Sequence, residues 1–229
     1  MPRPDELSPL TGVQLMGRNY EAFLHHARRH GYCDPFVPFV GDRYFAHGRR
    51  IVYCGVAPRY DEALRFAGPG EAAEWSRKVV LDHNIKSAFW RLIDRILQDI
   101  EPDRPAMARR ERIVWTNLSK LCSSDKATAP SDADAELRAL NVEQLRCEMA
   151  SLRPDLLLCV SGSQLQTTGV QAFGDLQCGP LTPNADQTWV RQLPTGGVLY
   201  WTMHPQGKSR AWVDAVLGDL AALLRNSQS

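Results

Sequence analysis

The chain has 229 residues, of which 44% are hydrophobic and 23% are charged, and its formal net charge is +1. This length and composition are typical of a globular protein with one core of ordinary size. The near-zero charge excludes a strongly basic nucleic-acid-binding domain, so any contact with DNA would depend on local patches. No apolar stretch approaches the roughly 20 residues that cross a bilayer, and no signal peptide is recognisable, so we expect a cytoplasmic protein with no membrane partner.

The six cysteines show no Cys-x-x-Cys spacing, and Cys54 and Cys159 lie within apolar runs. Cysteines inside buried strands are typical of reduced, structural thiols. We therefore expect free cysteines. A metal or cluster site held by cysteines far apart in the sequence is the alternative.

The N-terminal part of the chain is predicted to be helical. Residues 15–29 have helical periodicity, and prolines follow them. The first buried strand is predicted at 50–55, where β-branched and aromatic residues end at a glycine. We predict one domain over 1–229, in which 1–48 is a helical extension packed on the core.

The middle of the chain alternates between helix and strand. A helical region is predicted over 71–100, a strand over 112–116, a polar loop over 122–130 and a helix over 131–152 with Ser131 as its N-cap. One face of the first helical region carries apolar residues at three- and four-residue spacing: Phe89, Leu92, Ile93, Ile96 and Leu97.

The last third contains the most apolar strand of the chain. Residues 155–160 form an unbroken apolar run, which favours a central parallel strand covered on both faces. A turn and a short helix follow, and 188–193 predicts a small hairpin. The last strand is predicted at 198–202 and an amphipathic helix at 209–225.

Four principal strands with helices between them predict an α/β fold, namely a three-layer α/β/α sandwich around a four-stranded, mainly parallel sheet. Three short runs follow or close these strands: GVAP at 55–58, TNLSK at 116–120 and TMHPQ at 202–206. Open α/β sheets bind ligands beyond the carboxyl ends of their strands. The three runs therefore predict one site at that edge.

Together with the segment LRPDLLLCVSG at 152–162, these runs resemble the motifs of the uracil-DNA glycosylase superfamily, nearest to its thermophilic-type branch. The likeness extends in order and spacing from about residue 51 to residue 224. It implies a uracil-DNA glycosylase-like fold and hydrolytic removal of a uracil-like base from DNA, a DNA-repair reaction that needs no cofactor and no metal.

The resemblance assigns a role to each run. Asn117 would pair with the base, because its planar amide offers an acceptor and two donors. His204 would stabilise negative charge on the departing base. Gly55, Ala57 and Pro58 would form the turn beside the base, glycine for its backbone freedom. A turn-capping asparagine, a structural histidine and an ordinary strand-ending turn are the alternatives.

An aromatic residue and three basic residues are further candidates for contact with the base and with DNA. An aromatic platform for the base is expected, and Phe66 or Tyr60 is the candidate. Lys120, Lys208 and Arg210 are candidates for contact with DNA phosphates. Solvated surface charges are the alternative for all three.

The chain also departs from the family pattern. Ala57 stands where many of these enzymes carry the aspartate that orients the hydrolytic water. Asp61 or Glu62 would have to supply that carboxylate instead. The alternative for these two residues is that they are exposed acidic residues of a loop. The apolar wedge that often follows the histidine motif and fills the space left by the base is missing. The four cysteines that hold an iron–sulfur cluster in the thermophilic-type branch are not reproduced at the expected spacings. Whether the protein is an enzyme stays open, and a catalytically degenerate protein that binds nucleic acid or a nucleotide on the same fold is the second hypothesis.

Overall fold

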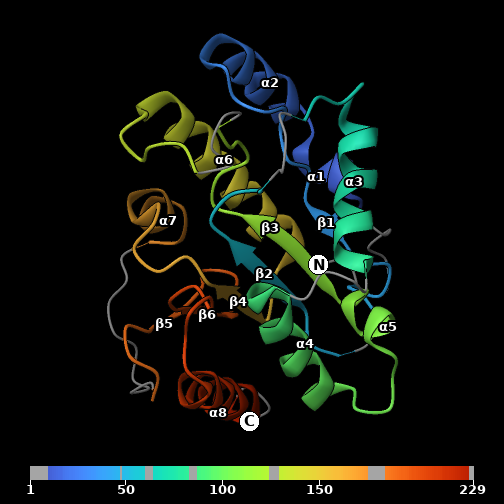
Figure 1. The fold of residues 1–229 in the computed structure, drawn as a ribbon, viewed down its shortest axis with the longest axis vertical. Helices are drawn as coiled ribbons and strands as arrows, with labels where there is room; N and C mark the ends of the chain where they lie inside the picture. Colours follow the sequence, from blue (N-terminus) through green and yellow to red (C-terminus); the bar gives the residue numbers. More distant parts are fainter. Residues whose placement is uncertain are drawn as a thin grey trace.

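The computed structural model of the protein describes residues 10–46, 48–59, 64–82, 87–123, 129–174 and 184–226. Figure 1 shows one sheet with helices packed around it. The mixed α/β class predicted from the sequence is confirmed. None of the described helices combines the length and the apolar character needed to cross a membrane.

Six strands make up the sheet, in the order β1-β3-β2-β4-β6-β5. The four central strands are parallel, and they are the predicted ones: β2 (Ile51–Gly55), β3 (Ile113–Asn117), β4 (Leu156–Cys159) and β6 (Val198–Trp201). The prediction of a four-stranded sheet is wrong, because an antiparallel strand borders each edge. These two strands are β1 (Phe39–Val40), paired with β3, and β5 (Trp189–Gln192), paired with β6.

The edge strands leave weak signals in the sequence. β1 has only two residues, too few for any periodicity, and it lies inside the predicted helical extension 1–48. That segment therefore contributes a strand to the sheet as well as helices. β5 lies in the segment predicted as a separate small hairpin, 188–193, but it pairs with β6 and belongs to the main sheet.

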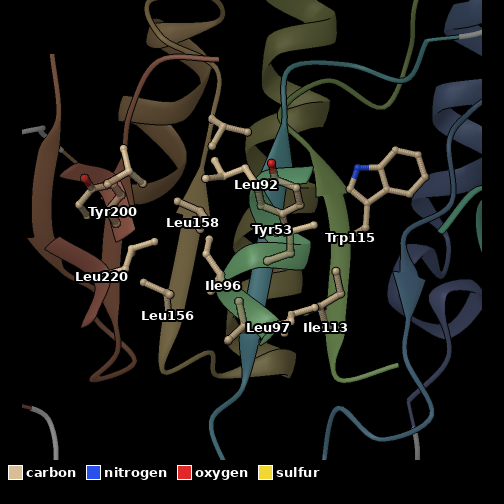
Figure 2. Packing of buried hydrophobic residues seen from close by; sticks show 14 of the residues in the cluster. Tyr53, Leu92, Ile96, Leu97, Ile113, Trp115, Leu156, Leu158, Tyr200 and Leu220 are labelled. Atoms are coloured by element: carbon tan, nitrogen blue, oxygen red, sulfur yellow. The ribbon is translucent and has the colours of Figure 1, made fainter. Parts of the chain in front are cut away.

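Helices cover both faces of the sheet, which confirms the three-layer arrangement. One face packs against α3 (Pro69–Leu81), α4 (Ala88–Ile100) and α8 (Arg210–Asn226), and the other against α1 (Gly12–Met16), α6 (Ala135–Leu152) and α7 (Gln166–Phe173). Successive strand residues point to opposite faces, so Tyr53 joins the first core and Cys54 the second. Figure 2 shows Leu92, Ile96 and Leu97 of α4 in the first core. Two helices complete the fold: α2 (Asn19–His30), beside α6, and α5 (Ala106–Arg110), before β3.

Helix boundaries differ from the predictions where local turns intervene. Gly17, with φ of 48°, separates α1 from α2 within the first predicted helix. The region 71–100 contains two helices, α3 and α4. Ser131 is not the N-cap of α6. Asp134 takes that position, because its carboxylate accepts a hydrogen bond from the backbone N–H of Leu137.

The described cysteines are free thiols, as expected: Cys33, Cys54, Cys122, Cys147 and Cys159. Only Cys147 is exposed among them. Burial raises the pKa of Cys54 well above its usual value, so this thiol stays protonated. Cys178 lies outside the described residues.

Candidate functional site

A cavity of about 1110 Å³ lies at the carboxyl ends of the parallel strands. Gly55 ends β2, Asn117 ends β3 and His204 follows β6, and all three line this cavity. The chain passes from β2 to β3 on one side and then crosses to β4 on the other. The end of β2 is therefore a switch point, where open α/β sheets bind ligands. Residues from all three runs, 55–58, 116–120 and 202–206, meet here.

Asn117 presents an unpaired amide to the cavity. Its side chain is only 1% exposed, and its Nδ2 atom has no hydrogen-bond partner among the described residues. Leaving a buried donor unpaired costs about 1–3 kcal/mol. The amide is therefore suited to a ligand that offers an acceptor atom.

Gly55 is required for space rather than for backbone freedom. It pairs with Asn117 in the regular register of β2 and β3. A Cβ atom at Gly55 would lie 2.5 Å from Oδ1 of Asn117 and 3.2 Å from the ring of Phe89. The sequence-based explanation, a special backbone conformation, is wrong at this position.

His204 is held as a neutral ring. Desolvation by burial lowers its pKa below the ordinary value, so it is uncharged at neutral pH. The backbone N–H of Gln206 donates to Nδ1 of His204 at 3.2 Å. In the neutral ring the proton is therefore on Nε2, which is left as a hydrogen-bond donor.

Aromatic side chains form one wall of the cavity. Phe89 lies in the first turn of α4, and its ring is nearly parallel to that of His204, with the centroids 6.1 Å apart. Trp75, Trp90 and Trp115 line the cavity beside it. The indole nitrogen of Trp115 is a second buried donor with no partner among the described residues.

Phe66 does not line the cavity, so its assignment as the platform is wrong. Its ring packs near Trp75 at a centroid distance of 6.3 Å, and its backbone N–H donates to Asp34. Phe89 is an aromatic residue that does line the cavity. A signal was available for Phe89, because a crossover helix runs antiparallel to its strands and its first turn lies near their carboxyl ends.

Lys120 cannot contact a phosphate, which corrects another prediction. Its side chain is completely buried, and its Nζ atom lies 3.0 Å from Oε1 of Glu148, which is also completely buried. Nζ also donates to Oγ1 of Thr116 at 2.6 Å and to the backbone carbonyl of Asn117 at 2.7 Å. Lys120 therefore supports the end of β3 from within.

The other predicted cations lie at the start of α8. The ammonium of Lys208 lies 5.7 Å above the ring of Trp212, and Arg210 is exposed, with Nε 3.8 Å from Asp214. Neither residue lines the cavity, whereas the exposed Arg59 does.

The other residues predicted in and just after the first run lie at the cavity, in the core or outside the described residues. Ala57 lines the cavity and Pro58 is buried. Asp61, with Tyr60 and Glu62, lies outside the described residues.

Asp132 is a cavity residue that no sequence motif indicated. Among the described residues that line the cavity, it is the only carboxylate. Its oxygens accept hydrogen bonds from the backbone N–H of Thr167 at 2.8 Å and from the hydroxyl of Thr168 at 2.6 Å. Asp132 is thus anchored to the first turn of α7. The sequence predicts position 132 within the helix 131–152, but α6 begins only at Ala135, so Asp132 lies in the loop before that helix.

Comparison of the chain with the models of known protein families found no match, and comparison with curated proteins found none either. The chemistry of the site follows from its geometry: an amide donor, an imidazole donor and aromatic walls around one space. A flat heterocycle with carbonyl oxygens has the complementary groups.

Proposed function

We propose that the cavity binds a uracil-like base and that the protein removes this base from DNA by hydrolysis, on a uracil-DNA glycosylase-like fold. One observation carries the proposal. The unpaired amide of Asn117 and the neutral ring of His204, 87 positions apart in the sequence (204 minus 117), line the same cavity. The resemblance of the three polar runs to the glycosylase motifs supports the same function.

The two groups would act on different atoms of the base. A uracil ring flipped out of the helix offers a carbonyl oxygen to the Nδ2 donor of Asn117. The Nε2 donor of His204 would stabilise the negative charge that develops on a second carbonyl as the glycosidic bond breaks. The ring of Phe89, close to both groups, offers a stacking surface.

The negative charge of Asp132 would favour the positive charge that develops on the sugar in the transition state. Its oxygens are already engaged with α7, so we assign it this electrostatic role and not the activation of water. Ala57 has no group that could orient water. Asp61 remains the sequence-based candidate for that step.

A second function, binding without catalysis, is favoured by one feature of the site. Asp132, the single carboxylate among the described lining residues, is committed to capping contacts, and Ala57 is inert. A protein with this cavity could retain a base or nucleotide without cleaving it.

The test is base release from single- and double-stranded oligonucleotides that contain uracil, hypoxanthine or xanthine. We expect release from the uracil substrate, and we expect Asn117→Ala and His204→Ala each to slow it by at least about tenfold. His25→Ala, an exposed change on α2, should leave the rate unchanged.

Oligonucleotide binding measured on the same proteins separates the two functions. Binding without release of any base, weakened by Asn117→Ala, would replace the enzymatic proposal with the binding function. Absence of both release and binding would contradict both.

A further inference from the structure

A group of three metal-ligating side chains lies where α2 meets α6, and none of them lines the cavity. His26, His30 and Glu136 each bring one ligand atom to within 4.8 Å of the others. The two histidines are four residues apart on α2, so they share one face of that helix. Glu136 lies in the first turn of α6.

His26 is oriented by a carboxylate. Its ring is 1% exposed, and its Nε2 atom lies 3.0 Å from Oδ2 of Asp134. The other oxygen of Asp134 accepts the Leu137 backbone N–H, which fixes the carboxylate as the N-cap of α6. Because Asp134 is an acceptor, Nε2 is the nitrogen of His26 that donates to it, and Nδ1 is the nitrogen that is left for a further ligand.

Nδ1 of His26 faces a second carboxylate. Nδ1 of His26 is buried without a hydrogen-bond partner among the described residues, and Oε1 of Glu136 lies 3.6 Å away. Two acceptors in this arrangement require a positive charge or a proton between them. Ligands at about 2.0–2.1 Å from a tetrahedral zinc ion lie a little over 3 Å from each other, so this pair needs only a small contraction to share an ion.

Arg29 currently supplies positive charge to the other side of the group. Its Nε donates to Nε2 of His30 at 2.9 Å, and its guanidinium also pairs with Glu136. His30 therefore also presents an acceptor nitrogen. Arg29 and His30 are both exposed, so the guanidinium can swing into solvent without disturbing the core.

We propose that His26, His30 and Glu136 bind a divalent transition-metal ion of the zinc class, which displaces Arg29 and joins α2 to α6. Two imidazole nitrogens and one carboxylate oxygen suit zinc, and also cobalt or nickel, better than magnesium or calcium. Asp134 is a positioning residue, because a carboxylate behind a ligating histidine fixes the ring and raises its basicity. The exposed side of the site leaves a fourth position to water.

The experiment is calorimetric titration of the untagged, metal-free protein with Zn²⁺ alone. We expect one bound ion and a rise in the unfolding temperature with Zn²⁺ concentration, because the ion binds only the folded site. His30→Ala and Glu136→Gln change exposed side chains and should each weaken binding by at least about tenfold. The matched control is His25→Ala, adjacent to His26 and exposed, which should bind as the wild type does.

Two further variants test the assigned roles. Arg29→Met should strengthen binding, because it removes the competing cation, and an unchanged affinity would overturn the displacement of Arg29. Asp134→Asn keeps an N-cap oxygen but loses the charge behind His26, so it should weaken binding by about 10- to 100-fold.

Spectroscopy with Co²⁺ identifies the ligands. We expect the visible bands of a tetrahedral nitrogen and oxygen site without thiolate charge transfer, unchanged in Cys147→Ser. Absence of Zn²⁺ binding by the wild type, or equal binding by His30→Ala and Glu136→Gln, would overturn the metal site.

Discussion

Asn117 reaches the cavity because the neighbouring strand ends in a residue without a side chain. Its amide oxygen occupies the space that a Cβ atom of Gly55 would need, and the ring of Phe89 closes the same space from α4. The packing of Gly55, Asn117 and Phe89, which come from three elements, thus requires that position 55 has no side chain. The unpaired Nδ2 atom is held in place by this packing.

Gly55→Ala should therefore damage the site while leaving the fold intact. The new methyl group would lie 2.5 Å from the Asn117 oxygen, so the amide or the strand end must move. We expect base binding or release to fall by at least about tenfold, since a shift of about 1 Å can cost 100-fold in rate.

The control for this variant is Gly70→Ala in α3, where an added Cβ meets no atom within 4 Å. Binding and release should be unchanged there. Full activity in Gly55→Ala would show that the position of the Asn117 amide does not matter.

At the scale of elements, β3 and α6 are joined by a buried ion pair. Lys120, just after β3, pairs with Glu148 of α6, and Gln144 donates to Glu148 at 2.9 Å. Both charges are completely buried, and hydrogen bonds from Lys120 also reach the backbone of Asn117. The network sets the position of the strand end that carries the amide.

Glu148→Gln should destabilise the protein strongly, because it leaves the ammonium of Lys120 buried without its partner charge. We expect a loss of about 3–5 kcal/mol in the free energy of unfolding, measured with urea. The double variant Lys120→Met/Glu148→Leu should lose less than the sum of its single changes, because it leaves no unpaired charge.

The matched control is the exposed pair of Lys78 and Glu74 in α3, whose charged atoms are also 3.0 Å apart. Glu74→Gln should cost only about 0.3–0.5 kcal/mol. Equal losses in Glu148→Gln and Glu74→Gln would contradict the structural role of the buried pair.

At the scale of the whole molecule, the N-terminal segment is part of the sheet and packs behind the site. β1 pairs with β3 through Phe39 and Val40. Phe36 is completely buried, and its ring meets Trp115, a cavity residue, at a centroid distance of 4.7 Å. The segment therefore contributes to the wall behind the cavity.

Removal of residues 1–48 should consequently abolish cooperative unfolding, since it exposes the edge of β3 and removes buried aromatic rings. Circular dichroism on heating and size-exclusion chromatography measure this. The point variant Phe36→Ala should retain the fold and lose about 3–5 kcal/mol of stability. A truncated chain that stays monomeric and unfolds at the temperature of the full chain would show that the segment is dispensable.

The parallel strands could be predicted because each is a continuous apolar run bounded by turn residues, and their carboxyl ends located the site. Asn117 and His204 could be selected because polar residues at such ends meet at one edge of a sheet. Phe66 and Lys120 were misassigned for a common reason. Proximity in the sequence does not show which side chains of a loop face the cavity. The polar neighbours of Lys120 in the sequence likewise do not show that its partner is the buried Glu148.

The sequence by itself determined the four parallel strands with helices between them, the three layers and the edge at which polar groups gather, because hydrophobic periodicity and turn residues are local properties. Only the tertiary structure decided that β1 and β5 extend the sheet, that Phe89 faces His204, that Asp132 reaches the cavity and that His26 meets Glu136. These contacts join residues far apart in the chain, and their geometry depends on how whole elements pack.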